Sequence, residues 1–128
     1  MKRLSWDNYF FNIAKEVATR STCPRASVGA VIVREHRILS TGYNGAPPGE
    51  PHCTEVGCLM ENNHCERTVH AETNAVAQAA RFGIPIDGST LYCWSIRQST
   101  GLPVGTCPKC TQVMRAAGII RVRVAEDK

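Results

Sequence analysis

The chain has 128 residues, of which 43% are hydrophobic and 20% are charged, and its formal net charge is +4. This length suits one compact domain over residues 1–128, and the composition is typical of a folded protein rather than a disordered one. The small positive excess suits an anionic small molecule better than a long nucleic acid. The longest apolar run, residues 28–33, is too short to span a membrane, and residues 1–7 lack the apolar stretch of a secretory signal. We therefore expect a cytoplasmic protein with no membrane partner.

The sequence predicts helices and strands in the order α-β-β-α-β-α-β. Helices are indicated by apolar side chains at helical spacing or by alanine-rich runs, and strands by short apolar runs bounded by turn residues. Ser5 is a suitable N-cap for the first helix, and Gly83 and Gly118 follow the other two at the C-cap position. The predicted elements cover residues 5–20, 27–34, 37–43, 70–82, 90–95, 107–117 and 119–125. This order predicts a mixed sheet with helices packed over it.

Several conspicuous residues are expected to be structural. Trp6, Tyr9 and Phe10 recur on one face of the first helix, and we expect them to pack there without stacking on a ligand. His36 lies in the turn between the first two strands, where we expect it to be solvated. Cys93 lies inside a predicted strand, and we expect it to fill the core.

Cysteine is the most informative residue type in the composition. The chain has seven cysteines, and in a reducing compartment clustered cysteines near histidines indicate metal ligands rather than disulfides. The connection over residues 49–69 has little periodicity but is rich in both residue types. A connection of this length needs something to hold it in place, and a bound metal would do so.

The strongest chemical signal is a pair of motifs that begin two predicted helices. One imidazole and two thiolates give three zinc ligands and leave the fourth tetrahedral position for water, as in a catalytic zinc site. Zinc lowers the pKa of that water to about 7. Glu72 can face the water as a proton shuttle without binding the metal. A paired-cysteine motif alone is weak, since redox sites and zinc knuckles share it. The two motifs are His70-Ala71-Glu72 and Cys107-Pro108-Lys109-Cys110.

Taken together, these motifs match the signature of zinc nucleobase deaminases. The chain resembles the cytidine/deoxycytidylate deaminase superfamily nearly from end to end, and most closely its bacterial and phage deoxycytidylate (dCMP) deaminases. The resemblance implies a three-layer α/β/α fold with a mixed sheet. It also implies hydrolytic deamination of dCMP to dUMP in pyrimidine deoxynucleotide metabolism. Hydroxide on zinc would attack C4 of the pyrimidine and ammonia would leave, while Glu72 protonates N3 and relays protons to the amine. The matching segments are residues 23–33, 41–47, 52–53, 57–58 and 64–75.

Four further cysteines suggest a second metal centre. They bracket the predicted hairpin and the irregular connection, where a closed four-thiolate zinc site would supply stability that packing cannot. The dCMP deaminases that this chain resembles carry a structural zinc, and its ligands match these positions. His64 or His52 could replace one of the thiolates. The alternative is that the four are free buried thiols, since cysteine often serves as a small core residue. The four positions are Cys23, Cys53, Cys58 and Cys65.

The resemblance also implies contacts with substrate and effectors. Arg25, Asn44 and Ala71 would contact the nucleotide, because the Asn44 amide can bond a sugar hydroxyl and an arginine can hold phosphate. Arg25 could instead lie at a subunit interface or cap a turn, and Asn44 could be a turn residue with positive φ. Effectors such as dCTP and dTTP would act in a homo-oligomer, a hexamer by resemblance. The segment that they would contact is Gly42-Tyr43-Asn44-Gly45.

The chain departs from the family pattern beside the paired cysteines. Family members place proline directly before the first of them, whereas here Thr106 precedes Cys107 and Pro108 follows it. The connection from Tyr92 to Cys107 is also longer than in the family and should border the pocket. The zinc chemistry is unaffected, but substrate identity is left open. The alternatives are another cytosine nucleoside or nucleotide, or a purine base.

A different class of function is a non-catalytic zinc module that binds nucleic acid. Such a module needs a basic stripe interleaved with aromatic residues, but the arginines here are scattered and aromatic residues make up only 6% of the chain. This alternative also leaves Glu72 without a role. The sequence therefore favours an enzyme.

Overall fold

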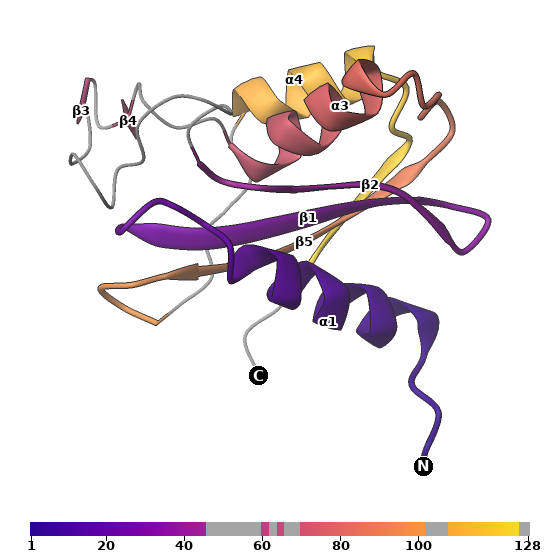
Figure 1. Cartoon of the computed structure of the whole chain (residues 1–128), viewed down its shortest axis with the longest axis horizontal. Helices are drawn as coiled ribbons and strands as arrows, with labels where there is room; N and C mark the ends of the chain where they lie inside the picture. The colour runs from indigo at the N-terminus through magenta and orange to yellow at the C-terminus, as the bar shows by residue number, and fades with distance from the viewer. Residues whose placement is uncertain (46–59, 62–63, 66–69, 102–107, 126–128) are drawn as a thin grey trace.

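The architecture is a mixed sheet between two layers of helices, seen here in a computed structural model that describes residues 1–45, 60–61, 64–65, 70–101 and 108–125. Within these ranges the main sheet has the strand order β2-β1-β5-β6. Strands β5 and β6 are parallel, and the other neighbouring pairs are antiparallel. Helix α1 covers one face, and α3 and α4 cover the other (Figure 1), which confirms the predicted three-layer α/β/α fold. The elements of these layers are α1 (Trp6–Ala18), β1 (Ala26–Arg34), β2 (Arg37–Tyr43), α3 (Ala71–Arg81), β5 (Thr90–Arg97), α4 (Pro108–Ala116) and β6 (Arg121–Val124).

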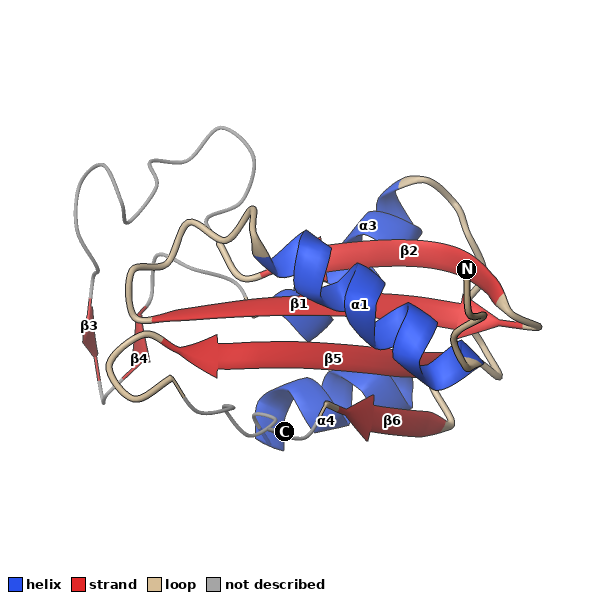
Figure 2. Cartoon of the chain, turned by 90° about the horizontal axis from the view of Figure 1, so that it is seen from below, coloured by secondary structure: helices blue, strands red, loops and turns tan. Residues whose placement is uncertain are grey.

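The central strand β1 divides the hydrophobic core in two. Its side chains alternate, so that Ala30 and Ile32 pack under α3 and α4, while Val31 and Val33 pack under α1. All four are buried. Because both faces of this strand are covered, its sequence is a continuous apolar run rather than an alternation of apolar and polar residues. Figure 2 shows the four strands from the α1 side, with α1 lying across β1.

Two glycines allow helices on opposite faces to approach the sheet closely. A Cβ at Gly29 would overlap the backbone of α1 at Ala14 and Ala18, and a Cβ at Gly42 would overlap the backbone of α3. The two glycines lie on paired strands one register position apart, since Gly29 pairs with Tyr43 and Ala30 pairs with Gly42. Gly42 therefore fixes the distance between β2 and the helix that carries the His70 motif.

The first helix buries less of its aromatic face than its sequence predicts. Ser5 is the N-cap, as predicted, and its side chain accepts a hydrogen bond from the Asn8 backbone N–H at 3.2 Å. The residues that face the sheet are Phe10, Ala14 and Ala18. Trp6 is 45% exposed and Tyr9 is 43% exposed, whereas Phe10 is 1% exposed. The three rings pack against one another on this face, as expected, but only Phe10 is buried in the core.

The tight turn after β1 has an unusual backbone. Glu35 and His36 have φ angles of 53° and 59°, values that ordinarily favour asparagine or glycine in this kind of hairpin turn. The His36 ring is exposed to solvent as predicted, but it also stacks on Trp6, with ring centroids 4.1 Å apart. A second difference lies in the cysteine-rich connection. There two short strands, β3 (Met60–Glu61) and β4 (His64–Cys65), pair antiparallel, which the sequence did not indicate.

None of the described helices is long and apolar enough to cross a membrane.

Candidate metal centre and active site

His70 lies at the start of α3, and its side chain is not used to cap the helix. The residue occupies the N-cap position with extended backbone angles, φ −67° and ψ 152°, and its side chain makes no capping hydrogen bond. Its carbonyl accepts the first bond of the helix, from the Asn74 backbone N–H at 2.8 Å. The imidazole points instead toward α4.

The imidazole of His70 meets the thiol of Cys110. The distance from His70 Nδ1 to Cys110 Sγ is 3.2 Å, and Cys110 is 3% exposed. A tetrahedral zinc ion with bonds of roughly 2.1 Å to nitrogen and 2.3 Å to sulfur would place these atoms about 3.6 Å apart. The two side chains therefore fit a shared zinc ion. The third predicted ligand, Cys107, lies outside the described residues, and within those residues no group of three metal-binding side chains is found.

The local electrostatics favour a thiolate at this position. Cys110 lies in the first turn of α4 and faces the start of α3, and the positive end of a helix dipole stabilises a nearby anion. The Thr73 hydroxyl lies 3.5 Å from Cys110 Sγ, where it can donate a hydrogen bond to the thiolate. Thr73 was not identified from the sequence. The sequence feature that could have pointed to Thr73 is its position one residue after Glu72, in the same first turn of the helix.

Glu72 is enclosed beside these ligands. It is 4% exposed, although it is a carboxylate in the first turn of a surface helix. A carboxylate in the first turn of a helix is stabilised by the helix dipole, so its placement there is favourable. Cys93 on β5 lies close by, and its thiol has a raised pKa because it is buried, with the charges of Glu72 and Cys110 as lesser causes. Cys93 is 4% exposed and belongs to the apolar core, as predicted.

Polar bonds to β2 fix the position of α3. The Ser40 hydroxyl donates to the Ala75 carbonyl at 2.7 Å, and the Asn74 side-chain amide donates to the Tyr43 carbonyl at 2.7 Å. Together with the close approach at Gly42, these bonds hold the first turn of α3 against the strand. Ser40 and Asn74 therefore position the metal site from outside it. Neither was identified from the sequence. A single polar residue in a strand or helix carries no signal of the distant element that it contacts.

The amide of Asn44 is engaged by the protein's own backbone. Its Oδ1 accepts from the Val28 N–H and its Nδ2 donates to the Ala26 carbonyl, both at 2.9 Å. Among the described non-glycine residues, positive φ angles occur only at Glu35 and His36, so Asn44 is not a left-handed turn residue. Its structural role is to join the end of β2 to the start of β1. Beyond these two bonds the amide has one further hydrogen to donate and one further oxygen lone pair.

The other predicted contact residues surround the same end of the sheet. Ala71, fully buried, is the first residue of α3, where backbone N–H groups have no partner within the helix. Arg25 is exposed just before β1, and its carbonyl accepts from the Gln98 N–H at 2.9 Å. Tyr43 is 37% exposed, whereas Gly42 and Gly45 are buried. For Gly42 the structure shows a packing role against α3.

The predicted second metal centre lies largely outside the described residues. Cys53 and Cys58 are outside them, as is the substitute His52. The backbones of His64 and Cys65 form β4. Cys23 lies in a turn before β1, where its backbone N–H donates to the Ser21 hydroxyl at 3.2 Å. The ligand set of this centre therefore stays a prediction.

Fold and site together define a class of protein. The site lies over one face of an α/β/α sandwich. It combines an imidazole and a thiolate from the ends of two helices with a buried carboxylate, and these are the parts of a metal-dependent hydrolytic site. The family model described as "Cytidine and deoxycytidylate deaminase zinc-binding region" matches residues 4–126. The chain belongs to this zinc-binding deaminase family.

Several curated proteins are similar to the chain. ComE operon protein 2 of Bacillus subtilis is 46% identical over 127 residues, which cover 99% of this chain and 62% of that protein. The deoxycytidylate deaminase of Saccharomyces cerevisiae is 41% identical over 73% of this chain, but only 31% of the yeast protein is covered. The deoxycytidylate deaminase of Mycobacterium phage D29 is 38% identical over 95% of both chains. The chain thus spans less than two thirds of the first two relatives and nearly all of the third.

Solved structures extend the comparison. The dCMP deaminase of cyanophage S-TIM5, in complex with dCMP and dUMP, is 27% identical with a TM-score of 0.77, and the match covers 100% of this chain and 86% of the phage protein. Cytidine deaminase from Mycobacterium tuberculosis, at 20% identity and a TM-score of 0.62, shares the fold. The layers described above are therefore those of the deaminase fold.

Proposed function

We propose that this protein catalyses the hydrolytic deamination of dCMP to dUMP. The observation that carries the proposal is the 3.2 Å approach of His70 Nδ1 to Cys110 Sγ beside the buried carboxylate of Glu72. The choice of dCMP is supported by the phage D29 relative, which is covered over 95% of its length and is a deoxycytidylate deaminase. The cyanophage enzyme, solved with dCMP and dUMP, supports it further.

The site residues divide the chemistry between them. His70 and Cys110, with Cys107 as the predicted third ligand, would hold zinc. A bound zinc ion supplies the Lewis acidity that makes water a nucleophile at neutral pH. In the net reaction the oxygen of water bonds to C4 of the pyrimidine, the bond from C4 to its amino nitrogen breaks, and ammonia leaves. Glu72 accepts a proton from water, delivers it to N3, and passes a further proton to the leaving amine.

The burial of Glu72 suits this role. A carboxylate that is 4% exposed exchanges protons with the groups beside it rather than with bulk water. The contacts from Ser40 and Asn74 keep the first turn of α3 in place, so that the carboxylate does not have to be repositioned between proton transfers. The backbone N–H of Ala71, Arg25 and the remaining donor of the Asn44 amide are proposed to contact the nucleotide.

A substrate panel tests the proposal. Ammonia release is measured from dCMP, dCTP, cytidine, deoxycytidine, cytosine and guanine with the zinc-loaded protein. We expect dCMP to give the highest kcat/KM. If dCMP is inert and another compound turns over, the zinc chemistry stands but the substrate is wrong. If all six are inert, the proposed activity itself fails.

We also propose a structural zinc held by Cys23, Cys53, Cys58 and Cys65, with His64 or His52 as a substitute ligand. The support is the cysteine-rich connection itself, because its length calls for a cross-link. Zinc content per chain decides the matter. Two equivalents are expected in the wild type and one in Cys23→Ser, while the matched core variant Cys93→Ala should keep two. One equivalent in protein never exposed to chelator would remove this site.

Regulation and assembly form a separate proposal. We propose a homo-oligomer, a hexamer by family resemblance, in which dCTP and dTTP act through the segment from Gly42 to Gly45. Tyr43 is the most exposed of these four residues and offers a ring to a ligand. Turnover of dCMP should respond to each triphosphate in the wild type and lose that response in Tyr43→Ala. An identical response in both proteins would exclude this segment. Sedimentation of the holoenzyme gives the oligomeric state directly.

A further inference from the structure

A hollow lies on the face of the sheet opposite the metal site. It has a volume of about 330 Å³, at the lower end of the range for small-molecule pockets. Its floor is formed by Val33, Thr90 and Tyr92, which belong to the side of the sheet that α1 covers. The His70 and Cys110 site lies under α3 and α4, on the other side (Figure 1). The hollow is therefore separate from the proposed catalytic centre.

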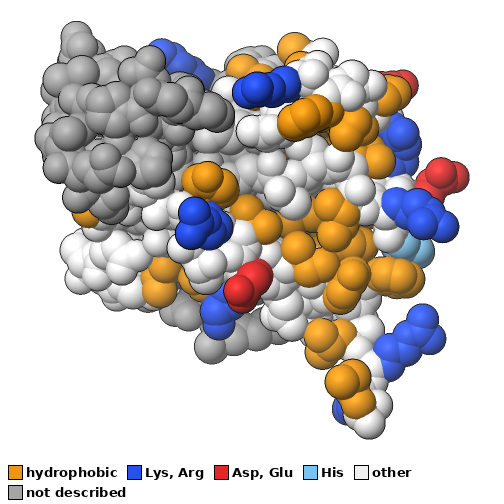
Figure 3. Space-filling model, viewed as in Figure 1, with side chains coloured by type: hydrophobic (Ala, Val, Ile, Leu, Met, Phe, Trp, Pro, Cys, Tyr) orange, Lys and Arg blue, Asp and Glu red, His pale blue; other side chains and the backbone are white. Residues whose placement is uncertain are grey.

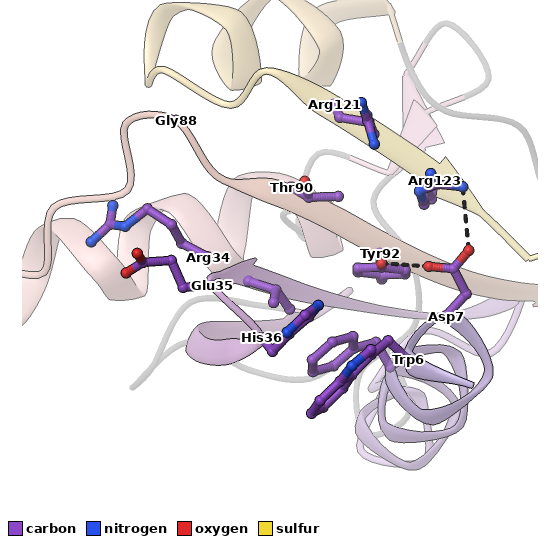
Figure 4. A pocket seen from close by; sticks show the side chains of 12 residues that line it. Trp6, Asp7, Arg34, Glu35, His36, Gly88, Thr90, Tyr92, Arg121 and Arg123 are labelled. Atoms are coloured by element: carbon purple, nitrogen blue, oxygen red, sulfur yellow. Dashed lines mark hydrogen bonds and ion pairs between the residues drawn. The ribbon is translucent and has the colours of Figure 1, made fainter. Parts of the chain in front are cut away.

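The walls of this hollow are rich in arginine. Arg34 comes from the end of β1, and Arg121 and Arg123 come from β6. Figure 4 shows Arg121 and Thr90 facing the same space, with Arg123 beside Asp7 and Tyr92. Arginine presents several donors in a planar fork, and it is the preferred residue for binding phosphate oxygens.

The arginines differ in how far their charge is balanced. Arg123 pairs with Asp7 at 3.3 Å, and Asp7 also accepts a hydrogen bond from the Tyr92 hydroxyl at 2.6 Å. Among the described groups, Arg34 donates to two neutral carbonyls alone, those of Pro85 and Asp87, at 3.1 and 3.0 Å. Within the described part of the chain, no hydrogen bond or ion pair holds the guanidinium of Arg121. Two positive charges, on Arg34 and Arg121, therefore have no acidic partner within ion-pair distance among the residues that the structure describes.

The acidic residues of the wall do not cancel this excess. Asp7 is committed to Arg123 and Tyr92. Glu35 is exposed in the hairpin turn, and it makes no ion pair with a described residue. Three arginines thus face two carboxylates around the hollow. The wall therefore has a net charge of +1, which favours an anionic ligand.

The remaining wall is aromatic and rests on a strained turn. His36 lies parallel to Trp6, with 4° between their planes and 4.1 Å between their centroids. The turn that presents this ring has positive φ at both Glu35 and His36, which costs about 1 kcal/mol or more for each non-glycine residue. Trp6 remains 45% exposed, so the stack is open to solvent along part of its surface. Figure 3 shows hydrophobic side chains gathered over α1 in this region.

We propose that this hollow binds a small phosphate ester that carries a planar ring. Its phosphate is held by Arg121 and Arg34 with the Thr90 hydroxyl, and its ring lies against the stack of His36 and Trp6. The volume exceeds what a phosphate group alone would occupy, so the hollow has room for the organic part as well. Nothing in this site is shared with the side chains of the metal centre.

Nuclear magnetic resonance of the holoenzyme tests the proposal, with phenyl phosphate, inorganic phosphate and phenol as probes. The two tryptophans provide an internal control, because Trp6 lines the hollow and Trp94 does not. Phenyl phosphate should shift the indole N–H signal of Trp6 and the amide signals of Gly88 and Thr90, and leave the Trp94 indole in place. Phosphate alone should bind more weakly, and phenol weakest. No shift at Trp6 at millimolar phenyl phosphate would overturn the proposal.

Two variants separate the charged contact from the aromatic one. Arg121→Ala should weaken phenyl phosphate and phosphate alike, by about tenfold, because one charge-assisted contact is lost. Arg20→Ala, an exposed arginine near the far end of α1, is the matched control and should change neither. His36→Gly should weaken phenyl phosphate but not phosphate, and the turn itself tolerates glycine better than histidine. Equal affinities in Arg121→Ala and Arg20→Ala would refute the phosphate site, and an unchanged preference for phenyl phosphate in His36→Gly would refute the ring contact.

Discussion

Substituting Gly42 by alanine should disable the metal site without touching any ligand. A Cβ at this position would overlap the Ala75 backbone nitrogen most closely and would lie 2.5 Å from the Ala71 carbonyl oxygen, whereas ordinary contact begins at 3.4 Å. Helix α3 would therefore have to retreat by more than 0.9 Å. Metal-ligand distances tolerate only about 0.2 Å, and His70 and Glu72 both lie in the first turn and N-cap of this helix. We expect dCMP turnover to fall by about 100-fold.

Gly29→Ala is the matched control for this prediction. Its Cβ would overlap the backbone on the opposite face at least as closely, at the Ala14 carbonyl oxygen and, at 2.7 Å, the Ala18 nitrogen, and so it displaces α1 rather than α3. Neither glycine has positive φ, so in both variants the cost comes from overlap alone. Each variant should lose about 1–3 kcal/mol of unfolding free energy in urea, but only Gly42→Ala should lose zinc affinity and turnover. Turnover in Gly42→Ala as high as in Gly29→Ala would refute the reasoning.

Two other predictions concern stability alone. Burial, followed by the hydrogen bond from its hydroxyl to Asp7, raises the pKa of Tyr92 from 10.0 to about 12. The protonated phenol therefore stabilises the fold fully below pH 10, and this contribution is lost as the pH rises through about 12. Urea unfolding at several alkaline pH values should show this loss in the wild type and not in Tyr92→Phe, and parallel slopes would contradict it. Ser40→Ala should cost about 1 kcal/mol, because the hydroxyl bonded to Ala75 is lost. Ser89→Ala should cost nothing or stabilise, since the buried Ser89 Oγ has no partner among the described groups; equal losses in the two variants would count against this reading.

The regular elements could be predicted from the sequence because each follows a local rule. The Ser5 cap, the apolar run that became β1, and the left-handed glycines Gly83 and Gly118 after α3 and α4 all lie where the pattern indicates. The strand ends moved by a few residues, as β5 continues to Arg97. Such ends depend on pairing with a neighbouring strand, and the sequence of one strand does not contain that information.

The candidate metal site, which stays a prediction, could be proposed from the sequence for a different reason. His70, Glu72 and Cys110 belong to short motifs whose spacing is set by the chemistry of the ligand, so they are recognisable before the fold is known. The residues that hold these motifs in place are not. Gly42 and Ser40 act through contacts with α3, a helix some thirty residues further along the chain. Spacing within one element says nothing about such distant contacts.

The aromatic residues of α1 show where helical periodicity misleads. Trp6, Tyr9 and Phe10 satisfy the spacing of one face, yet only Phe10 is buried, because the sheet under the helix is met by Phe10, Ala14 and Ala18. Trp6 extends beyond the strands and meets the hairpin turn instead. The arginine-lined hollow was also invisible in the sequence, since its walls come from α1, β1, β5 and β6.

In the proposed reaction His70 and Cys110 hold the metal while Glu72 moves the protons. The most direct test is the rate of dUMP formation by zinc-loaded Glu72→Ala, with zinc content measured on the same sample. We expect full zinc occupancy and a rate lower by a factor of about 100 to 10,000, since the proton carrier is lost and the ligands remain. A rate near that of the wild type at full zinc occupancy would contradict the account.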